Sequence, residues 1–145
     1  MIYTELTIRA MRLAYDAHHG QNDCNGVPYI FHPFHVAEQM TDEISVCVAL
    51  LHDVVEDTSV SLDDLSREFP KEVVRAVGLL THDSCDDYYE YLKQIKSDPY
   101  ARAVKIADVL HNSDQSRIID PDSVSEEKKK RWKEKYDKAL ELLTK

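Results

Sequence analysis

Glycine, proline and long apolar runs are scarce in this chain of 145 residues, which has three glycines and five prolines. This scarcity excludes a collagen-like fibre and a flexible linker, and an apolar fraction of 43% is typical of a globular domain with its own core. No apolar run approaches the ~20 residues that span a bilayer, and the N-terminus has no signal-peptide pattern. We therefore expect one cytoplasmic domain over residues 1–145.

Basic residues are also few: the chain has 18 lysines and arginines against 27 aspartates and glutamates, which gives a formal net charge of −9. This balance argues against a nucleic-acid polymer or an anionic membrane as a general partner. A phosphorylated small molecule would need a metal ion or a local basic cluster. The cysteines Cys24, Cys47 and Cys85 form no CxxC pair, so we interpret them as free thiols of a reducing cytosol.

Almost every segment has helical periodicity, and there is neither an alternating strand pattern nor an internal repeat. Capping residues and prolines, among them Ser61, Pro70 and Asp86, set the expected helix starts. Residues 29–31 are expected to be short and extended. The predicted helices cover residues 2–18, 33–40, 44–57, 61–65, 70–80, 87–97, 99–118 and 125–143. The sequence thus predicts an all-α, single-domain helical bundle.

The predicted helix over residues 44–57 has an apolar arc wide enough to be enclosed by neighbouring helices. The remaining arc holds one imidazole and three carboxylates, which belong to His52, Asp53, Glu56 and Asp57. Residues four apart lie above one another on a helix, so these groups share one inward stripe. Because burying such charges is costly without compensation, a metal cation is the simplest explanation.

A second polar stripe lies on the helix after Pro99, where Lys105, Asp108 and Asn112 are at i, i+3 and i+7. Taken alone, a buried Asp beside a Lys is typical of a structural ion pair. If this helix faces the central one, their polar groups meet and His32 completes the set. Imidazole and carboxylate ligands suit Mn²⁺, Fe²⁺ or Zn²⁺.

The expected metal ligands are His32, His52, Asp53 and Asp108. A bound metal lowers the pKa of its water and so supplies a nucleophile near neutral pH. Glu56 and Asp57 could position that water or transfer its proton. Alternatively, they bind a second ion or orient the ligands.

The order His32, His52-Asp53 and Asp108 resembles the H…HD…D signature of the HD superfamily of metal-dependent phosphohydrolases. Three blocks are more specifically similar to the hydrolase domain of RelA/SpoT homologues. They are GVPYIFHP at residues 26–33, ALLHDVVEDT at 49–58 and VKIADVLHN at 104–112. The likeness covers about residues 6–119, with a C-terminal packing helix at about 125–143. Since no synthetase or regulatory domain follows, we expect a small stand-alone member.

The resemblance implies an HD-type helical bundle that holds Mn²⁺ on His32, His52, Asp53 and Asp108. It also implies that Glu56 and Asp57 are catalytic and that Asn112 lies beside the substrate, with Lys105 as a further substrate-binding candidate. The implied reaction removes the 3′-pyrophosphate from guanosine tetra- or pentaphosphate. The partner would then be a phosphorylated nucleotide.

One departure from the family pattern concerns substrate recognition. Alarmone hydrolases usually have an Arg-Lys pair before the glycine that matches Gly26, whereas this chain has Asp23 and Cys24. An acid and a thiol cannot supply cationic stacking or pair with a phosphate. Two alternatives to an alarmone hydrolase follow: an HD hydrolase of a different nucleotide, and a nucleotide sensor with little turnover. A metal-free Asp/His network would leave the inward carboxylates uncompensated.

Several other polar residues have simpler interpretations. Spare histidines, which we expect on the surface or hydrogen-bonded in the core, are His18, His19, His35, His82 and His111. His35 is the spare histidine best placed to approach the site, one turn after His32. Lysines and acids alternate on the C-terminal helix, which indicates a solvated face with i,i+4 pairs rather than a docking strip. Trp132 and Tyr136 are expected on its buried side.

Overall fold

The computed structural model describes residues 1–82 and 87–145. The helices are α1 (Glu5–Ala17), α2 (Phe31–Glu38), α3 (Glu43–Leu51), α4 (Val54–Asp57), α5 (Leu62–Ser66), α6 (Lys71–Leu80), α7 (Tyr88–Lys96), α8 (Pro99–Asn112) and α9 (Glu126–Thr144). Two 3₁₀ turns, Gln115–Arg117 and Pro121–Ser123, connect α8 to α9. The described ranges contain no β-strand, only an isolated bridge between Asn22 and Pro28. The prediction of an all-α domain is confirmed.

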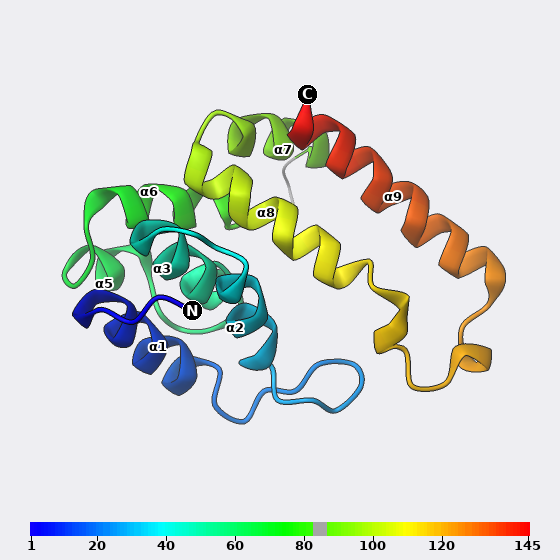
Figure 1. Ribbon diagram of the computed structural model, residues 1–145, viewed down its shortest axis with the longest axis horizontal. Coiled ribbons are helices and arrows are strands. Elements are labelled where there is room, and N and C mark those ends of the chain that lie inside the picture. Colours follow the sequence, from blue (N-terminus) through cyan, green and yellow to red (C-terminus); the bar gives the residue numbers. More distant parts are fainter. Residues whose placement is uncertain (83–86) are drawn as a thin grey trace.

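Helix α3 is the centre of the fold, and α1, α2, α6 and α8 all pack against it (Figure 1). Helix α8 crosses the molecule, and α9 returns alongside it to pack on α7 and α8. Because α3 is enclosed on every side, residues 45–51 are all buried. The wide apolar arc predicted for this helix is therefore confirmed. None of the helices in the described ranges is both long and apolar enough to cross a bilayer.

Several predicted boundaries differ from the structure because of local hydrogen bonds. Helix α1 begins at Glu5 rather than at residue 2, since Thr4 and Thr7 form a reciprocal capping box. Residues 29–31 are not extended: Ile30 has helical torsions and α2 already begins at Phe31. Helix α8 ends at Asn112, not at residue 118, and a 3₁₀ turn follows.

Other predicted starts agree with the structure. Ser61 caps α5 and Pro70 precedes α6. Asp87 caps α7, whereas Asp86, the expected start, lies outside the described residues together with Cys85. Cys24 and Cys47 are free thiols, as expected.

The buried Leu50 of α3 provides a test of this core. Leu50 is 1% exposed, whereas Leu110 on α8 is 54% exposed. We expect Leu50→Ala to lower the free energy of unfolding by about 2–5 kcal/mol, because it leaves a cavity in a close-packed core. The matched variant Leu110→Ala should change it by less than about 0.5 kcal/mol. Urea unfolding of both variants measures the difference, and equal losses would contradict this assignment of the core.

Candidate metal centre

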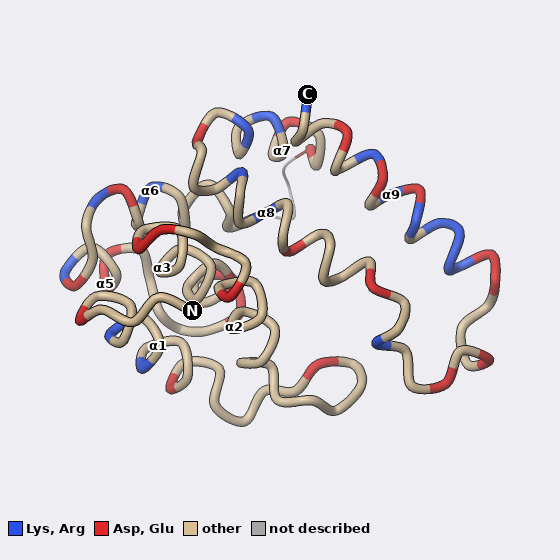
Figure 2. Tube along the Cα trace, in the orientation of Figure 1, with Lys and Arg blue, Asp and Glu red and all other residues tan. Residues whose placement is uncertain are grey.

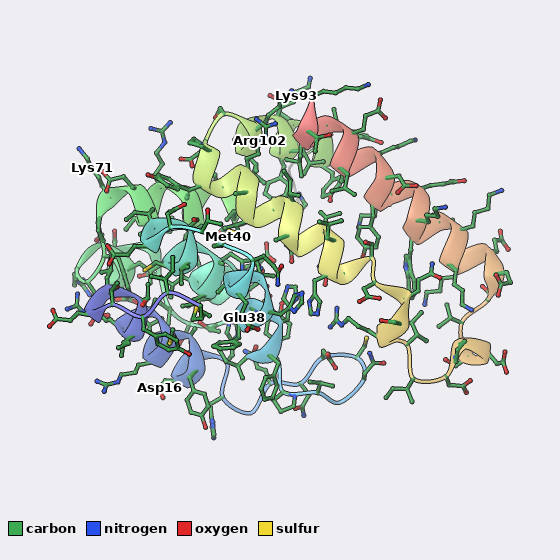
Figure 3. The ribbon with its side chains drawn as sticks, viewed as in Figure 1. Asp16, Glu38, Met40, Lys71, Lys93 and Arg102 are labelled. Atoms are coloured by element: carbon green, nitrogen blue, oxygen red, sulfur yellow. The ribbon has the colours of Figure 1, made fainter. Side chains whose placement is uncertain are left out.

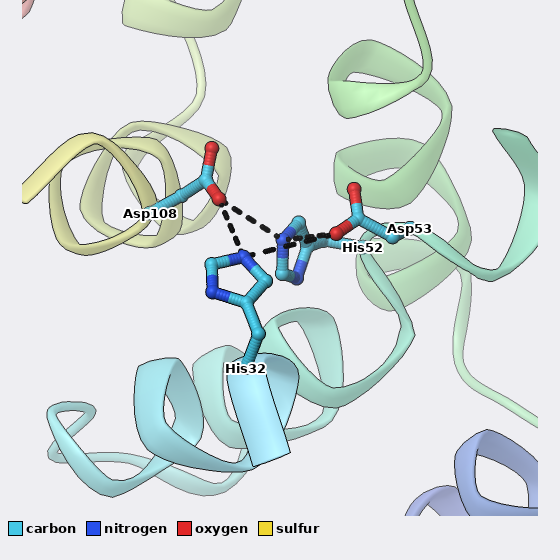
Figure 4. Close-up of side chains that lie close together, drawn as sticks. All are labelled: His32, His52, Asp53 and Asp108. Atoms are coloured by element: carbon cyan, nitrogen blue, oxygen red, sulfur yellow. Dashed lines mark hydrogen bonds and ion pairs between the residues drawn. The ribbon is translucent and has the colours of Figure 1, made fainter. Parts of the chain in front are cut away.

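Four side chains from three parts of the chain converge beneath α8 (Figure 4). One ligand atom from each of His32, His52, Asp53 and Asp108 lies within 4.8 Å of the others. His32 Nε2 is 2.8 Å from Asp108 Oδ1, and His52 Nε2 is 3.0 Å from Asp53 Oδ2. The structure thus brings together all four residues that the sequence predicts as metal ligands.

The central helix is interrupted at His52 and Asp53, whereas the sequence predicts a continuous helix to residue 57. The reason is a side-chain contact: His52 Nδ1 lies 2.5 Å from the carbonyl oxygen of Ala49. This carbonyl belongs to the last turn of α3, where backbone acceptors need partners from outside the helix. A new turn, α4, then begins at Val54. The break turns His52 and Asp53 towards the same point in space (Figure 4).

The contact with Ala49 also decides which nitrogen of His52 faces the site. A carbonyl only accepts, so Nδ1 carries a proton and, in the neutral ring, the lone pair of Nε2 points at two carboxylates. Nε2 is 3.0 Å from Asp53 Oδ2 and 3.5 Å from Asp108 Oδ1. A lone pair facing carboxylate oxygens requires a cation or a proton between them. The donor set of two imidazoles and two carboxylates therefore fits a divalent metal ion.

The charges of the cluster favour a positive charge between the two carboxylates. Burial opposes charge on His52, but Asp53 and Asp108 outweigh it and raise the pKa of His52 well above its usual range. Burial likewise disfavours ionised Asp53, yet His52 lowers its pKa to about 2. Hydrogen bonds from His32 and His52 hold the pKa of Asp108 well below its usual range in spite of burial. Both carboxylates are thus ionised and available as ligands.

Three further side chains hold these carboxylates in place. The Tyr29 hydroxyl donates to Asp53 Oδ2 at 2.6 Å. Lys105 Nζ donates to Asp108 Oδ2 at 3.0 Å, and Asn112 Nδ2 donates to Asp108 Oδ1 at 3.1 Å. Lys105 and Asn112 are therefore at the site, where they contact a predicted ligand directly. Tyr29 was not identified from the sequence, which predicts only an extended segment there.

Glu56 and Asp57 lie next to the cluster on α4. One carboxylate oxygen from each of Asp53, Glu56 and Asp57 lies within 4.8 Å of the others. Glu56 accepts a hydrogen bond from the backbone N–H of His82 at 2.7 Å. Partial burial, together with the neighbouring acids, raises the pKa of Glu56 and of Asp57 above the ordinary values. A raised pKa brings a carboxylate closer to the range in which it can accept and return a proton near neutral pH.

A cleft of about 1100 Å³ lies between His32, which is the member of the cluster that lines it, and α9. Tyr29, His32 and Asn112, which contact the cluster or belong to it, are among its lining residues. The loop after α1 and the connection from α8 to α9 line its sides, and Lys128, Trp132, Lys133, Tyr136 and Asp137 of α9 also contribute. Basic residues are concentrated on α9 (Figure 2). Lys128 and Lys133 are exposed, as expected for a solvated face, and Trp132 is half-buried where it lines the cleft.

The loop at Asp23 contacts a cation that the sequence alone does not indicate. Asp23 Oδ2 lies 3.4 Å from Arg117 Nη2, while Asp23 Oδ1 accepts backbone hydrogen bonds from Asn25 and Val27. Asn25 Nδ2 in turn donates to the Arg117 carbonyl oxygen at 2.9 Å. Arg117 thus lines the cleft beside the loop where the family pattern has its Arg-Lys pair. Sequence spacing could not show this, because Arg117 follows Asp23 by 94 residues.

Arg9 and Arg102 are not among the residues that line the cleft. Arg9 donates to the Glu68 carbonyl oxygen at 2.9 Å. Arg102 is near the start of α8, at the opposite end of the helix from Asn112 (Figure 3). A helix rises 1.5 Å per residue, so Arg102 is about 15 Å from the Asn112 end.

The fold and the site together define an all-α protein with a buried histidine-aspartate cluster open to a cleft. The chain belongs to the HD domain family, which matches residues 10–82. This membership confirms the resemblance stated from the sequence. The match ends before Asp108, so the fourth member of the cluster comes from the structure and the three sequence blocks.

Two relatives whose names state an activity are similar to this chain in sequence. A guanosine-3′,5′-bis(diphosphate) 3′-pyrophosphohydrolase, MESH1 of Mus musculus, is 38% identical over 103 residues, which are 63% of this chain and 58% of the relative. The Homo sapiens MESH1 protein is 36% identical over 117 residues, 73% of this chain and 65% of the relative. The chain thus spans less than two thirds of either relative.

A solved structure agrees with the fold over almost the whole chain. It is described as a metazoan ortholog of SpoT that hydrolyzes ppGpp and plays a role in starvation responses. The TM-score is 0.80 at 25% sequence identity, and the superposition covers 99% of this chain and 88% of the other. The likeness therefore extends through α9, beyond the residues that match the HD domain.

Proposed function

We propose that the chain is a metal-dependent phosphohydrolase that removes the 3′-pyrophosphate of guanosine tetra- or pentaphosphate. The observation that carries the proposal is the cluster of His32, His52, Asp53 and Asp108, of which His32 lines a cleft of about 1100 Å³. The names and folds of the relatives support this substrate class. The reaction breaks the bond between the 3′ oxygen and phosphorus, and water adds to the released pyrophosphate.

His32, His52, Asp53 and Asp108 would hold one divalent cation, for which we propose Mn²⁺, with Fe²⁺ and Zn²⁺ as the other candidates. When bound, such a cation supplies Lewis acidity to a phosphoryl oxygen and to water. Tyr29 and Lys105 keep the carboxylates of Asp53 and Asp108 oriented. Their hydrogen bonds also spread the negative charge of the site, which the anionic substrate would otherwise meet directly.

Glu56 and Asp57 are the proposed catalytic carboxylates. Their raised pKa values suit proton transfer, with Glu56 accepting the proton of the attacking water. The hydrogen bond from the His82 backbone holds the Glu56 carboxylate in place. Asp57 lies close enough to take part in positioning water or in returning a proton to the leaving 3′ oxygen. Lys105 and Asn112 complete the proposed substrate end of the site.

The rest of the cleft offers the groups that a guanosine nucleotide needs. Arg117, Lys128 and Lys133 can neutralise phosphates in a chain whose net charge is −9. Trp132 provides an aromatic surface, and Lys128 Nζ lies 5.1 Å from its ring centroid. A purine can stack on such a ring. We place the reaction in the cytoplasm, where the free thiols of Cys24 and Cys47 stay reduced.

The proposal is tested by incubating the Mn²⁺-loaded protein with guanosine tetraphosphate, deoxynucleoside triphosphates, nucleoside monophosphates and NADPH. We expect guanosine diphosphate and pyrophosphate from the first substrate, resolved by anion-exchange chromatography, and no product after chelation of the metal. If only another nucleotide is hydrolysed, the proposed substrate is wrong, but the proposed metal-dependent hydrolysis stands. Tight binding without product from any compound would indicate a nucleotide sensor and overturn the proposal.

A further inference from the structure

The histidine cluster continues beyond the proposed metal ligands, on the side of His32 that faces away from the site. His32 Nδ1 lies 2.7 Å from Nδ1 of His111, a residue of α8. The two ring planes differ by only 10°, with centroids 4.9 Å apart. Because ring N–H groups and lone pairs lie in the ring plane, this geometry suits a nitrogen-to-nitrogen hydrogen bond.

His111 is itself held from two sides. Its ring stacks on His35, with centroids 4.0 Å apart and planes 23° from parallel. Its carbonyl oxygen accepts a hydrogen bond from Arg117 Nη1 at 3.0 Å. His35 comes from α2, the same helix as His32, so His111 is inserted between two residues of one helix. A side chain constrained in this way can fix the orientation of its partner.

The direction of the His32–His111 hydrogen bond depends on what His32 Nε2 faces. Without a cation, Nε2 donates its proton to Asp108 Oδ1 at 2.8 Å, and Nδ1 is then the acceptor. To offer a lone pair to a cation, His32 must instead carry its proton on Nδ1. His111 Nδ1 then becomes the acceptor, and its own proton moves to Nε2. A histidine partner can serve both states because each of its ring nitrogens can donate or accept.

We infer that His111 is a positioning residue that fixes the orientation and tautomer of His32 for metal binding, with His35 clamping its ring. The inference rests on the metal site of the proposed function and adds a residue that does not contact the metal or the substrate. Outer partners of metal-binding histidines typically contribute about 10–100-fold to metal affinity. Helix α8 would then contribute His111 to the site in addition to Lys105, Asp108 and Asn112.

The test uses two substitutions that separate ring packing from hydrogen bonding. His111→Phe keeps an aromatic ring to stack on His35 but has no acceptor, whereas His111→Asn places an amide oxygen near the position of Nδ1. We expect Mn²⁺ affinity, measured by calorimetry, to fall about 10–100-fold in His111→Phe and to recover largely in His111→Asn. His19→Phe, at an exposed histidine, is the matched control and should bind Mn²⁺ as the wild type does. Circular dichroism of the metal-free proteins checks their folding.

A second readout does not depend on activity. In ¹⁵N spectra of the imidazole rings, Zn²⁺ should move the His32 proton from Nε2 to Nδ1 and the His111 proton from Nδ1 to Nε2. Unchanged Mn²⁺ affinity in His111→Phe, or a His32 proton that stays on Nε2 with Zn²⁺, would overturn the inference. If the wild type takes up no metal, the proposed function fails. The metal-free spectra would still show whether His111 orients His32, since His111→Phe must shift the His32 Nδ1 signal if the hydrogen bond exists.

Discussion

Asp53→Ala and His52→Ala should each remove the bound metal ion and lower hydrolysis by about a thousandfold, since Lewis-acid assistance contributes several kcal/mol to such reactions. Both residues contribute a ligand atom to the four-residue cluster, and each is also the close partner of the other at 3.0 Å. Elemental analysis after dialysis should find about one divalent metal ion per wild-type chain and almost none in either variant.

The matched control for this pair is Asp63→Ala, which removes an exposed carboxylate from α5. Its metal content and turnover should equal those of the wild type. Thermal unfolding of the metal-free proteins separates a lost ligand from a lost fold. Full metal occupancy in the double variant His52→Ala/Asp53→Ala would show that the ion binds elsewhere and would end the assignment of this cluster as the metal site.

Glu56→Gln should retain the bound metal ion, unlike the two ligand variants. Its turnover should still fall by about 10²–10⁴-fold, the usual contribution of a general acid-base residue. The amide can still accept the hydrogen bond from the His82 backbone that the carboxylate accepts at 2.7 Å, so the loop contact is preserved. The expected change is in kcat, with Mn²⁺ affinity close to that of the wild type. Single-turnover assays at saturating substrate measure it.

Glu72→Gln, an exposed glutamate in the first turn of α6, is the control for the same chemical change and should leave kcat unaltered. Loss of metal from Glu56→Gln would contradict the separation of ligands from catalytic groups. In that case Glu56 would belong to the metal site itself, which is the alternative that the sequence leaves open for the Glu56-Asp57 pair.

Periodicity and chemistry were enough to predict the helical fold and to single out the four clustered residues. The polar stripe of α8 and the enclosed helix α3 are both properties of local sequence, and each shows directly in the spacing of residue types. Asp108, taken alone, was expected to pair with Lys105, and His32 joined the set only on the condition that the two helices face each other. The inferences about α3 and about α8 each depend on a single helix.

The features that the sequence did not predict depend on contacts between distant segments. The break after Leu51 follows from the contact of the His52 imidazole with the Ala49 carbonyl oxygen. Helix propensities of single residues do not predict such a contact. Arg117 reaches the Asp23 loop because the connection after α8 passes beside that loop. His111 was grouped with the spare histidines, and His35 was preferred because it follows His32 by one turn. The structure places His111 against His32 directly, with His35 behind it.

The spread of the cluster along the chain has a consequence for how the protein folds. His32 and Asp108 are 76 residues apart, so their side chains can meet only after most of the polypeptide has collapsed. An ion bound there would stabilise the native state but would contribute little to the folding transition state, if the cluster forms late. Added Mn²⁺ should therefore slow unfolding and leave the refolding rate nearly unchanged in stopped-flow experiments. The bound ion would then lower the unfolding rate without being needed for the chain to fold.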